Sequence, residues 1–77
     1  MALIKSFSPS TMTRNSLHDG IEAKYAIFNY DDRTFVQIDS FGRSTREVPG
    51  KKSQTIQLDR DSAAQLYKIL KNAFDFT

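Results

Sequence analysis

The middle of the chain alternates side-chain types with a period of two residues, which is the repeat of a β-strand. This pattern predicts strands over residues 22–29, 34–41 and 53–58. Between the first two strands, residues 30–33 form a polar run with two aspartates, whose side chains can bond their own backbone. The sequence therefore predicts a β-hairpin with a tight turn at this run.

The second predicted strand has two unlike faces. Val36 and Ile38 point to one side and suit a hydrophobic core. The alternate residues point to the other side, and they are Phe35, Gln37, Asp39 and Phe41. We expect this aromatic and polar face to be wet or covered by a partner.

A helix is predicted after the third strand. Asp59 is a good N-cap, and Asp61 places negative charge in the first turn, where the helix dipole favours it. Apolar residues then recur at three- and four-residue steps, at Ala63, Leu66, Tyr67, Leu70, Ala73 and Phe74. This stripe is expected to be core. It is wider than a three-stranded sheet needs, so a second copy of the helix is expected to cover the surplus, through Leu66, Tyr67, Leu70 and Phe74.

These elements predict an α+β fold, a small antiparallel β-meander of three to five strands packed by one C-terminal amphipathic helix. The 77 residues leave room for a single domain. Within it, residues 1–22 hold a short strand over residues 3–7 and an irregular segment, and residues 23–77 hold the meander and the helix. Residues 75–77 are expected to fray.

Composition narrows the possible functions. The chain has no cysteine, so neither a disulfide nor a thiolate metal site can stabilise it, and small domains of this kind often gain core as homodimers. No apolar run approaches the roughly 20 residues that span a bilayer, and the expected location is the cytoplasm. The only histidine, His18, has no evident neighbour with which to activate a nucleophile. We therefore expect no enzymatic activity, no catalytic residue, no metal and no cofactor.

The basic excess of the chain lies in one short stretch. Residues 42–52 hold four basic side chains and one acidic side chain, whereas the whole chain has a net charge of only +2. Such a local patch can steer an anion even when the molecule is nearly neutral. The four basic residues are Arg43, Arg46, Lys51 and Lys52.

Hairpin geometry is expected to bring Arg33 and Lys24 within reach of this stretch, with Tyr30, Phe35 and Phe41 on the same side of the sheet. Cations that follow phosphates and rings that stack on bases are what a single-stranded nucleic-acid surface requires. The alternative is a solvated loop beside a dimer interface that contains Phe35 and Phe41.

The run Val48-Pro49-Gly50-Lys51-Lys52, followed by a strand that ends in Leu58 and a helix capped at Asp59, resembles the transcriptional-coactivator family of single-stranded-DNA-binding proteins. The resemblance, to a whirly-like β-meander with a C-terminal helix, covers roughly residues 23–74. It implies a four-stranded curved sheet, dimerisation through the helices, and single-stranded DNA held by basic side chains and stacked on aromatic rings. Lys51 and Lys52 match the basic pair of that family. Where the family usually has one glycine after the pair, this chain has Ser53-Gln54-Thr55, so the register of the strand stays open.

The sequence thus predicts a small dimeric module that binds single-stranded DNA or RNA with little sequence preference. Its expected contacts are Arg33, Arg43, Arg46, Lys51 and Lys52 to phosphates and Phe41 to bases, with Tyr30 or Phe35 as further rings. The alternative function is a protein–protein adaptor or accessory subunit that docks a partner on the sheet face or on a strand edge.

Overall fold

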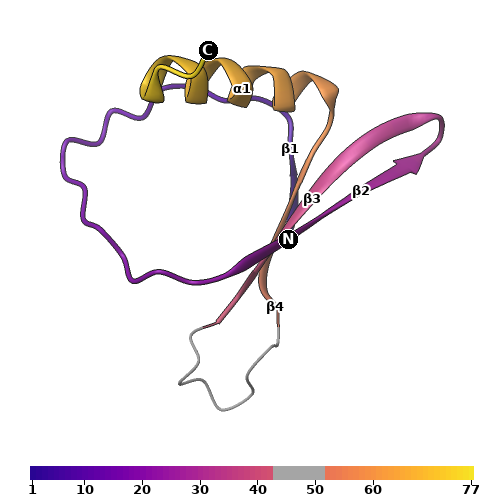
Figure 1. The fold of residues 1–77 in the computed structure, drawn as a ribbon, viewed down its shortest axis with the longest axis horizontal. Coiled ribbons are helices and arrows are strands. Elements are labelled where there is room, and N and C mark those ends of the chain that lie inside the picture. Colours follow the sequence, from indigo (N-terminus) through magenta and orange to yellow (C-terminus); the bar gives the residue numbers. More distant parts are fainter. Residues whose placement is uncertain (43–51) are drawn as a thin grey trace.

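The fold was obtained as a computed structural model, which describes residues 1–42 and 52–77, without the side chains of Lys52 and Ser53. The described elements are β1 (Ala2–Ile4), β2 (Ala23–Tyr30), β3 (Arg33–Phe41), β4 (Lys52–Leu58) and α1 (Arg60–Phe74), and Figure 1 shows their arrangement.

One four-stranded sheet has the strand order β1-β4-β3-β2. The pairs β2–β3 and β3–β4 are antiparallel, as expected for a meander, and with α1 they confirm the α+β fold. The sheet is mixed, because β1 pairs with β4 in parallel, with Leu3 opposite Gln57. The N-terminal strand is also shorter than predicted and ends at Ile4. After it the chain leaves the sheet, and the backbone N–H of Phe7 donates a hydrogen bond of 2.9 Å to Oε1 of Gln65 on α1.

The hairpin between β2 and β3 turns within the predicted polar run of residues 30–33, but more tightly than those four residues suggest. Tyr30 pairs with Arg33, so only Asp31 and Asp32 form the loop. Their φ angles are 50° and 59°, which is the left-handed conformation that a type I′ turn requires at both central positions. Aspartate tolerates this conformation better than most residues, because its short side chain can bond the local backbone.

The helix begins as predicted, with Asp59 as its N-cap. Oδ1 of Asp59 accepts a hydrogen bond of 2.9 Å from the N–H of Ser62, and Oγ of Ser62 accepts one of 3.0 Å from the N–H of Asp59. This reciprocal capping box satisfies two backbone donors. At the other end, Asp75 adopts a left-handed conformation with φ of 55°, and its N–H and that of Phe76 bond the carbonyl of Lys71.

The expected burial of the helix stripe is wrong for the single chain. Tyr67, Leu70 and Phe74 are exposed, and Leu66 is half-buried. A single residue, Asp59, joins β4 to α1, so the helix crosses the end of the sheet and does not fold back over it (Figure 1). Contact with the sheet is therefore confined largely to the first turns of the helix.

The core differs from the prediction as well. Among the described residues, Phe35 and Leu58 are the buried hydrophobic side chains, whereas Val36 and Ile38 are only half-buried. Leu58 is the last residue of β4 and lies at the junction with α1, where it lines a pocket together with Ala63 and Tyr67. The helix does not extend over the middle of β3, so the two residues expected in the core remain partly open.

Candidate nucleic-acid interface

The strand register defines an aromatic face on one side of the sheet. Phe28 stands opposite Phe35, Lys24 opposite Asp39, and Gln37 opposite Gln57. This face carries side chains from all four strands: Leu3, Lys24, Ala26, Phe28, Tyr30, Arg33, Phe35, Gln37, Asp39, Phe41, Thr55 and Gln57. The predicted sharing of one face by Tyr30, Phe35 and Phe41 agrees with this register.

Phe35 lies beneath its neighbours on the aromatic face. Its ring stacks on that of Phe28, with centroids 5.5 Å apart and an angle of 21° between the planes. The guanidinium carbon of Arg33 lies 4.9 Å from the Phe35 centroid. As a result Phe35 is only 7% exposed, and a nucleic-acid base could not stack on it unless these neighbours moved.

Phe41 is better placed for such a contact. It is half-buried at the end of β3, and Nζ of Lys24 lies 5.3 Å from the centroid of its ring. A cation at this distance is attracted by the face of an aromatic ring. The register of the sheet is irregular between Ser40 and Phe41, and Phe41 is paired with Lys52. Phe41 and Lys24 therefore stand together where the chain leaves β3 and where β4 begins.

A polar network occupies the centre of the aromatic face. Nε2 of Gln57 donates to Oε1 of Gln37 at 2.9 Å, and Nε2 of Gln37 donates to both carboxylate oxygens of Asp39 at 3.2 Å. The hydroxyl of Thr55 donates to Oδ1 of Asp39 at 2.7 Å. These bonds link β3 to β4 and hold Asp39 in a fixed orientation with only 7% of its surface exposed. Sequence reasoning missed the network, because it depends on the register between two strands that are separated by the basic stretch.

Arg33 lies at the opposite end of β3 from Phe41. Eight residue steps separate the two positions, which is about 26 Å at roughly 3.3 Å per residue. The structure therefore does not bring Arg33 together with the end of the sheet from which the basic stretch departs. Lys24 is at that end, as predicted.

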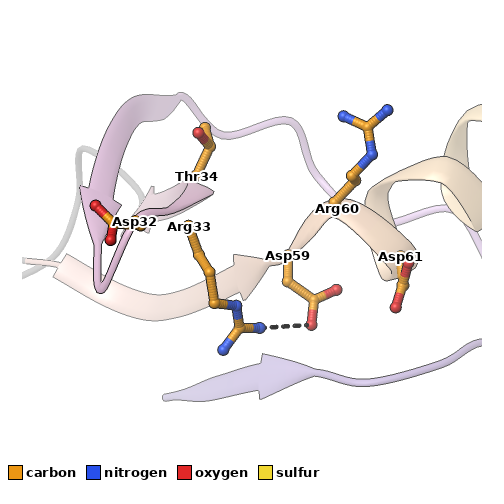
Figure 2. Close-up of a pocket in the computed structure, with 6 residues that line it drawn as sticks. All are labelled: Asp32, Arg33, Thr34, Asp59, Arg60 and Asp61. Atoms are coloured by element: carbon orange, nitrogen blue, oxygen red, sulfur yellow. Dashed lines mark ion pairs between the residues drawn. The ribbon is translucent and has the colours of Figure 1, made fainter.

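Arg33 instead contributes to a pocket between the hairpin turn and the start of α1. Its Nη2 lies 3.5 Å from Oδ2 of Asp59, and Figure 2 shows Arg60 pointing away from this pair. The pocket is lined by Asp32, Arg33, Thr34, Asp59, Arg60 and Asp61. With three acidic and two basic side chains, it does not have the charge that a phosphate site requires.

The N–H of Ser62 is the main reason why the pKa of Asp59 lies below its ordinary value of 3.8. Partial burial opposes this effect, and the hydroxyl of Ser62 and the charge of Arg33 support it. Asp59 is therefore an ionised cap of the helix, and its partners are structural.

Arg43, Arg46 and Lys51 lie outside the described residues, as does the side chain of Lys52. The proposed dimer residues Leu66, Tyr67, Leu70 and Phe74 are all on α1. Within residues 1–42 and 52–77, no group of three or more acidic, histidine or cysteine side chains could hold a metal ion. Nor does the described part of the chain contain a helix long and apolar enough to cross a membrane.

Comparisons of this chain with protein-family models, with curated proteins and with solved structures gave no match.

Proposed function

We propose that this protein is a small homodimeric module that binds single-stranded nucleic acid, DNA in the first instance, with little sequence preference. The observation that carries the proposal is the pairing of Phe41 with Lys24 at one end of the sheet. This is the end from which residues 42–52, with three net positive charges, depart.

Each part of this arrangement has a physical role. The basic side chains neutralise phosphates and release condensed counterions, which gives affinity without reading sequence. The ring of Phe41 offers a face on which any base can stack, at about 1–3 kcal/mol per base. The resemblance to the transcriptional-coactivator family supports the same function and suggests a role in transcription.

The polar network next to Phe41 sets the geometry of this surface. Asp39 is directly opposite Lys24 on the neighbouring strand, and its carboxylate is held by Gln37 and Thr55. The network fixes the backbone and side chains of β3 directly beside Phe41, and Lys24 lies over the Phe41 ring, so the ring and the cation are close together before a ligand arrives. Such preorganisation lowers the entropic cost of binding.

The test is a fluorescence-anisotropy titration of a labelled single strand at several salt concentrations, with the corresponding duplex as a control. Changing Lys51 and Lys52 together to Gln is expected to weaken binding and to reduce the slope of log affinity against log salt by roughly one to two units. The matched control changes Lys68 and Lys71 on α1 to Gln, removes the same charge and should leave the slope almost unchanged. An unchanged slope in the Lys51/Lys52 variant would remove these residues from the site.

Phe41→Ala separates stacking from charge in the same assay. It should lower the affinity at every salt concentration by about 1–3 kcal/mol and leave the slope intact. Absence of binding to any strand at low salt would overturn the proposal.

A protein adaptor is the second candidate, and the position of β2 favours it. This eight-residue strand is at the edge of the sheet, where its outer backbone groups could pair with an added strand of a partner. Adaptor binding should survive moderate salt, whereas nucleic-acid binding should fall steeply with it. The salt titration therefore discriminates between the two functions.

A further inference from the structure

The side of the sheet opposite the aromatic face has an apolar centre. Two rows of apolar side chains cross all four strands in register there, between the pair Ser40–Gln54 at one end and the pair Asn29–Thr34 at the other. One row contains Tyr25, Ile38, Ile56 and Ala2, and the other contains Ile27, Val36, Leu58 and Ile4. None of these eight side chains is charged. We call this surface the apolar face.

The chain covers only the part of the apolar face that lies near α1. Leu58 is buried near the start of α1, and Ile4 is half-buried on β1. Towards β2 the cover is lost, and Tyr25 is 75% exposed and Ile27 66% exposed. These two side chains continue the partly open row positions Ile38 and Val36 on β3, and a contiguous exposed apolar patch, unlike scattered apolar groups, marks an interaction surface.

The open stripe of α1 lies next to this face. Tyr67 lines the same pocket as Val36 and Leu58, so the stripe continues directly from the sheet surface. Beyond Tyr67, the stripe runs through Leu70 to Phe74, which is 65% exposed. The helix and the apolar face thus form one continuous apolar surface around the junction at Asp59.

The total exposed area is large for a chain of this mass. The chain exposes 7230 Å², whereas a folded monomer of its mass, 8.8 kDa, is expected to expose about 4,800 Å². Part of the surplus belongs to residues 5–22, which leave the sheet between β1 and β2, and the exposed apolar face and helix stripe supply another part. Obligate homodimers bury about 2,000–5,000 Å² in total, and the apolar face with the helix stripe is the surface that a second copy could cover in an interface of this class.

We infer that a second copy of this chain covers the apolar face, with the helix stripe of each copy lying across the open part of the sheet of the other. A two-fold interface must be self-complementary. Here each chain has an apolar sheet face that no helix covers and an apolar helix stripe that packs against no sheet. Contact between the helices alone would leave Tyr25 and Ile27 in water. Contact between the sheets alone would leave Tyr67 and Phe74 in water.

The charge pattern fits the same partner. The cores of protein interfaces are depleted in charged residues, and neither the rows of the sheet nor Tyr67, Leu70 and Phe74 contain one. Lys68 and Lys71 are neighbours of the stripe in the sequence and are exposed, as expected for a polar rim. This inference rests on the homodimer of the proposed function but not on nucleic-acid binding, because the aromatic face lies on the other side of the sheet.

The absence of cysteine allows a direct test by disulfide cross-linking. One single-cysteine variant, Ile27→Cys, is mixed with Tyr67→Cys, Leu70→Cys or Phe74→Cys, each carrying a tag of different size. Mild oxidation without nucleic acid should give mixed disulfides between residue 27 and at least one helix position in excess of either self-linked product. Met12→Cys, at an exposed position outside the apolar face, is the control partner and should give little mixed product.

A dominant self-linked product of the helix variants would overturn the inference in favour of packing between helices. A monomer in light scattering, with no disulfide product, would overturn it as well. Because nucleic acid is absent, these results are independent of the binding titration, and either can fail alone.

A pair of charge variants gives a second measurement. Ile27→Glu and Ala26→Glu change adjacent exposed residues of β2 that point to opposite faces. Ile27→Glu should weaken dimerisation by at least about a hundredfold, and Ala26→Glu should leave it nearly unchanged. Equal behaviour of the two variants in sedimentation equilibrium would exclude the apolar face from the interface.

Discussion

Ser62 shows how a single hydroxyl group can hold the junction between sheet and helix. It is completely buried, and it both accepts from the N–H of Asp59 and donates to the Asp59 side chain. Ser62→Ala leaves the N–H of Asp59 without this partner, so we expect a loss of about 1 kcal/mol in the free energy of unfolding, measured by urea denaturation. Asp61→Ala, which removes a first-turn charge but neither of these bonds, should cost less. An equal loss in both variants would show that the capping box adds nothing beyond charge.

The carboxylate of Asp59 makes this junction sensitive to acid. The Ser62 N–H lowers the pKa of Asp59 in the folded state below its ordinary value of 3.8, so the unfolded chain takes up a proton at this position more readily. The stabilisation is therefore fully present above that value and is lost as the pH falls below it, towards the folded-state pKa. Asp59→Asn keeps a capping side chain but cannot titrate. The stability difference between the native chain and this variant, from denaturation at several pH values, should be constant near neutrality and shrink below pH 3.8. A difference that does not change with pH would contradict this assignment.

At the scale of elements, the hairpin turn holds two non-glycine residues in a left-handed conformation, which is unfavourable for most side chains. Asp31 and Asp32 both have positive φ angles, a conformation for which Asn-Gly is the preferred pair in a type I′ turn. Replacing the two residues by Asn-Gly should stabilise the protein by about 0.5–1 kcal/mol in urea unfolding. The matched control, Ala-Ala, removes the same charges but fits the left-handed conformation poorly, and it should destabilise. Equal effects of the two variants would mean that charge, not backbone conformation, determines the stability of the turn.

Local patterns predicted the elements well, because their causes are local. The alternation of side chains located the last three strands to within one residue at each end, whereas β1 ends three residues earlier than predicted; the spacing around Asp59 located the helix start. The parallel pairing of β1 could not be predicted, since residues 5–22 separate it from the rest of the sheet. The helix stripe was predicted to be core because an amphipathic pattern indicates that one face of the helix is covered. The pattern does not indicate whether the same chain or a second chain covers it.

For the candidate site, too, local features were predictable from the sequence and contacts between distant residues were not. Strand alternation placed Phe41 and Phe35 on one face, but it could not show that Phe28 and Arg33 cover Phe35. Nearness along the hairpin suggested that Arg33 joins the basic stretch. The length of β3 instead carries Arg33 to the far end, where Asp59 is its partner. The face that a side chain occupies follows from the sequence, whereas the contacts between strands and the distances between the ends of the sheet require the fold.

At the scale of the whole molecule, the chain is too open for a self-sufficient monomer. Its radius of gyration is 14.7 Å, whereas about 11.5 Å is expected for a compact domain of this length. Part of the excess comes from residues 5–22, which leave the sheet and run beside α1 before they return to β2 (Figure 1). The exposed helix stripe and apolar face leave apolar surface for a second chain to cover, so folding and association should be linked.

This linkage predicts that thermal stability depends on protein concentration. If the folded chain exists mainly as a dimer, dilution favours the unfolded monomer by mass action, and Tm falls. We expect a lower Tm in calorimetry when two samples differ roughly a hundredfold in concentration, and the shift should vanish in a chain whose two copies are joined by a long flexible linker. The linked chain is the control, because its effective concentration does not change with dilution. A Tm that stays constant for the unlinked protein would mean that one chain is stable alone with its apolar face in water, and the dimer would then have no part in folding.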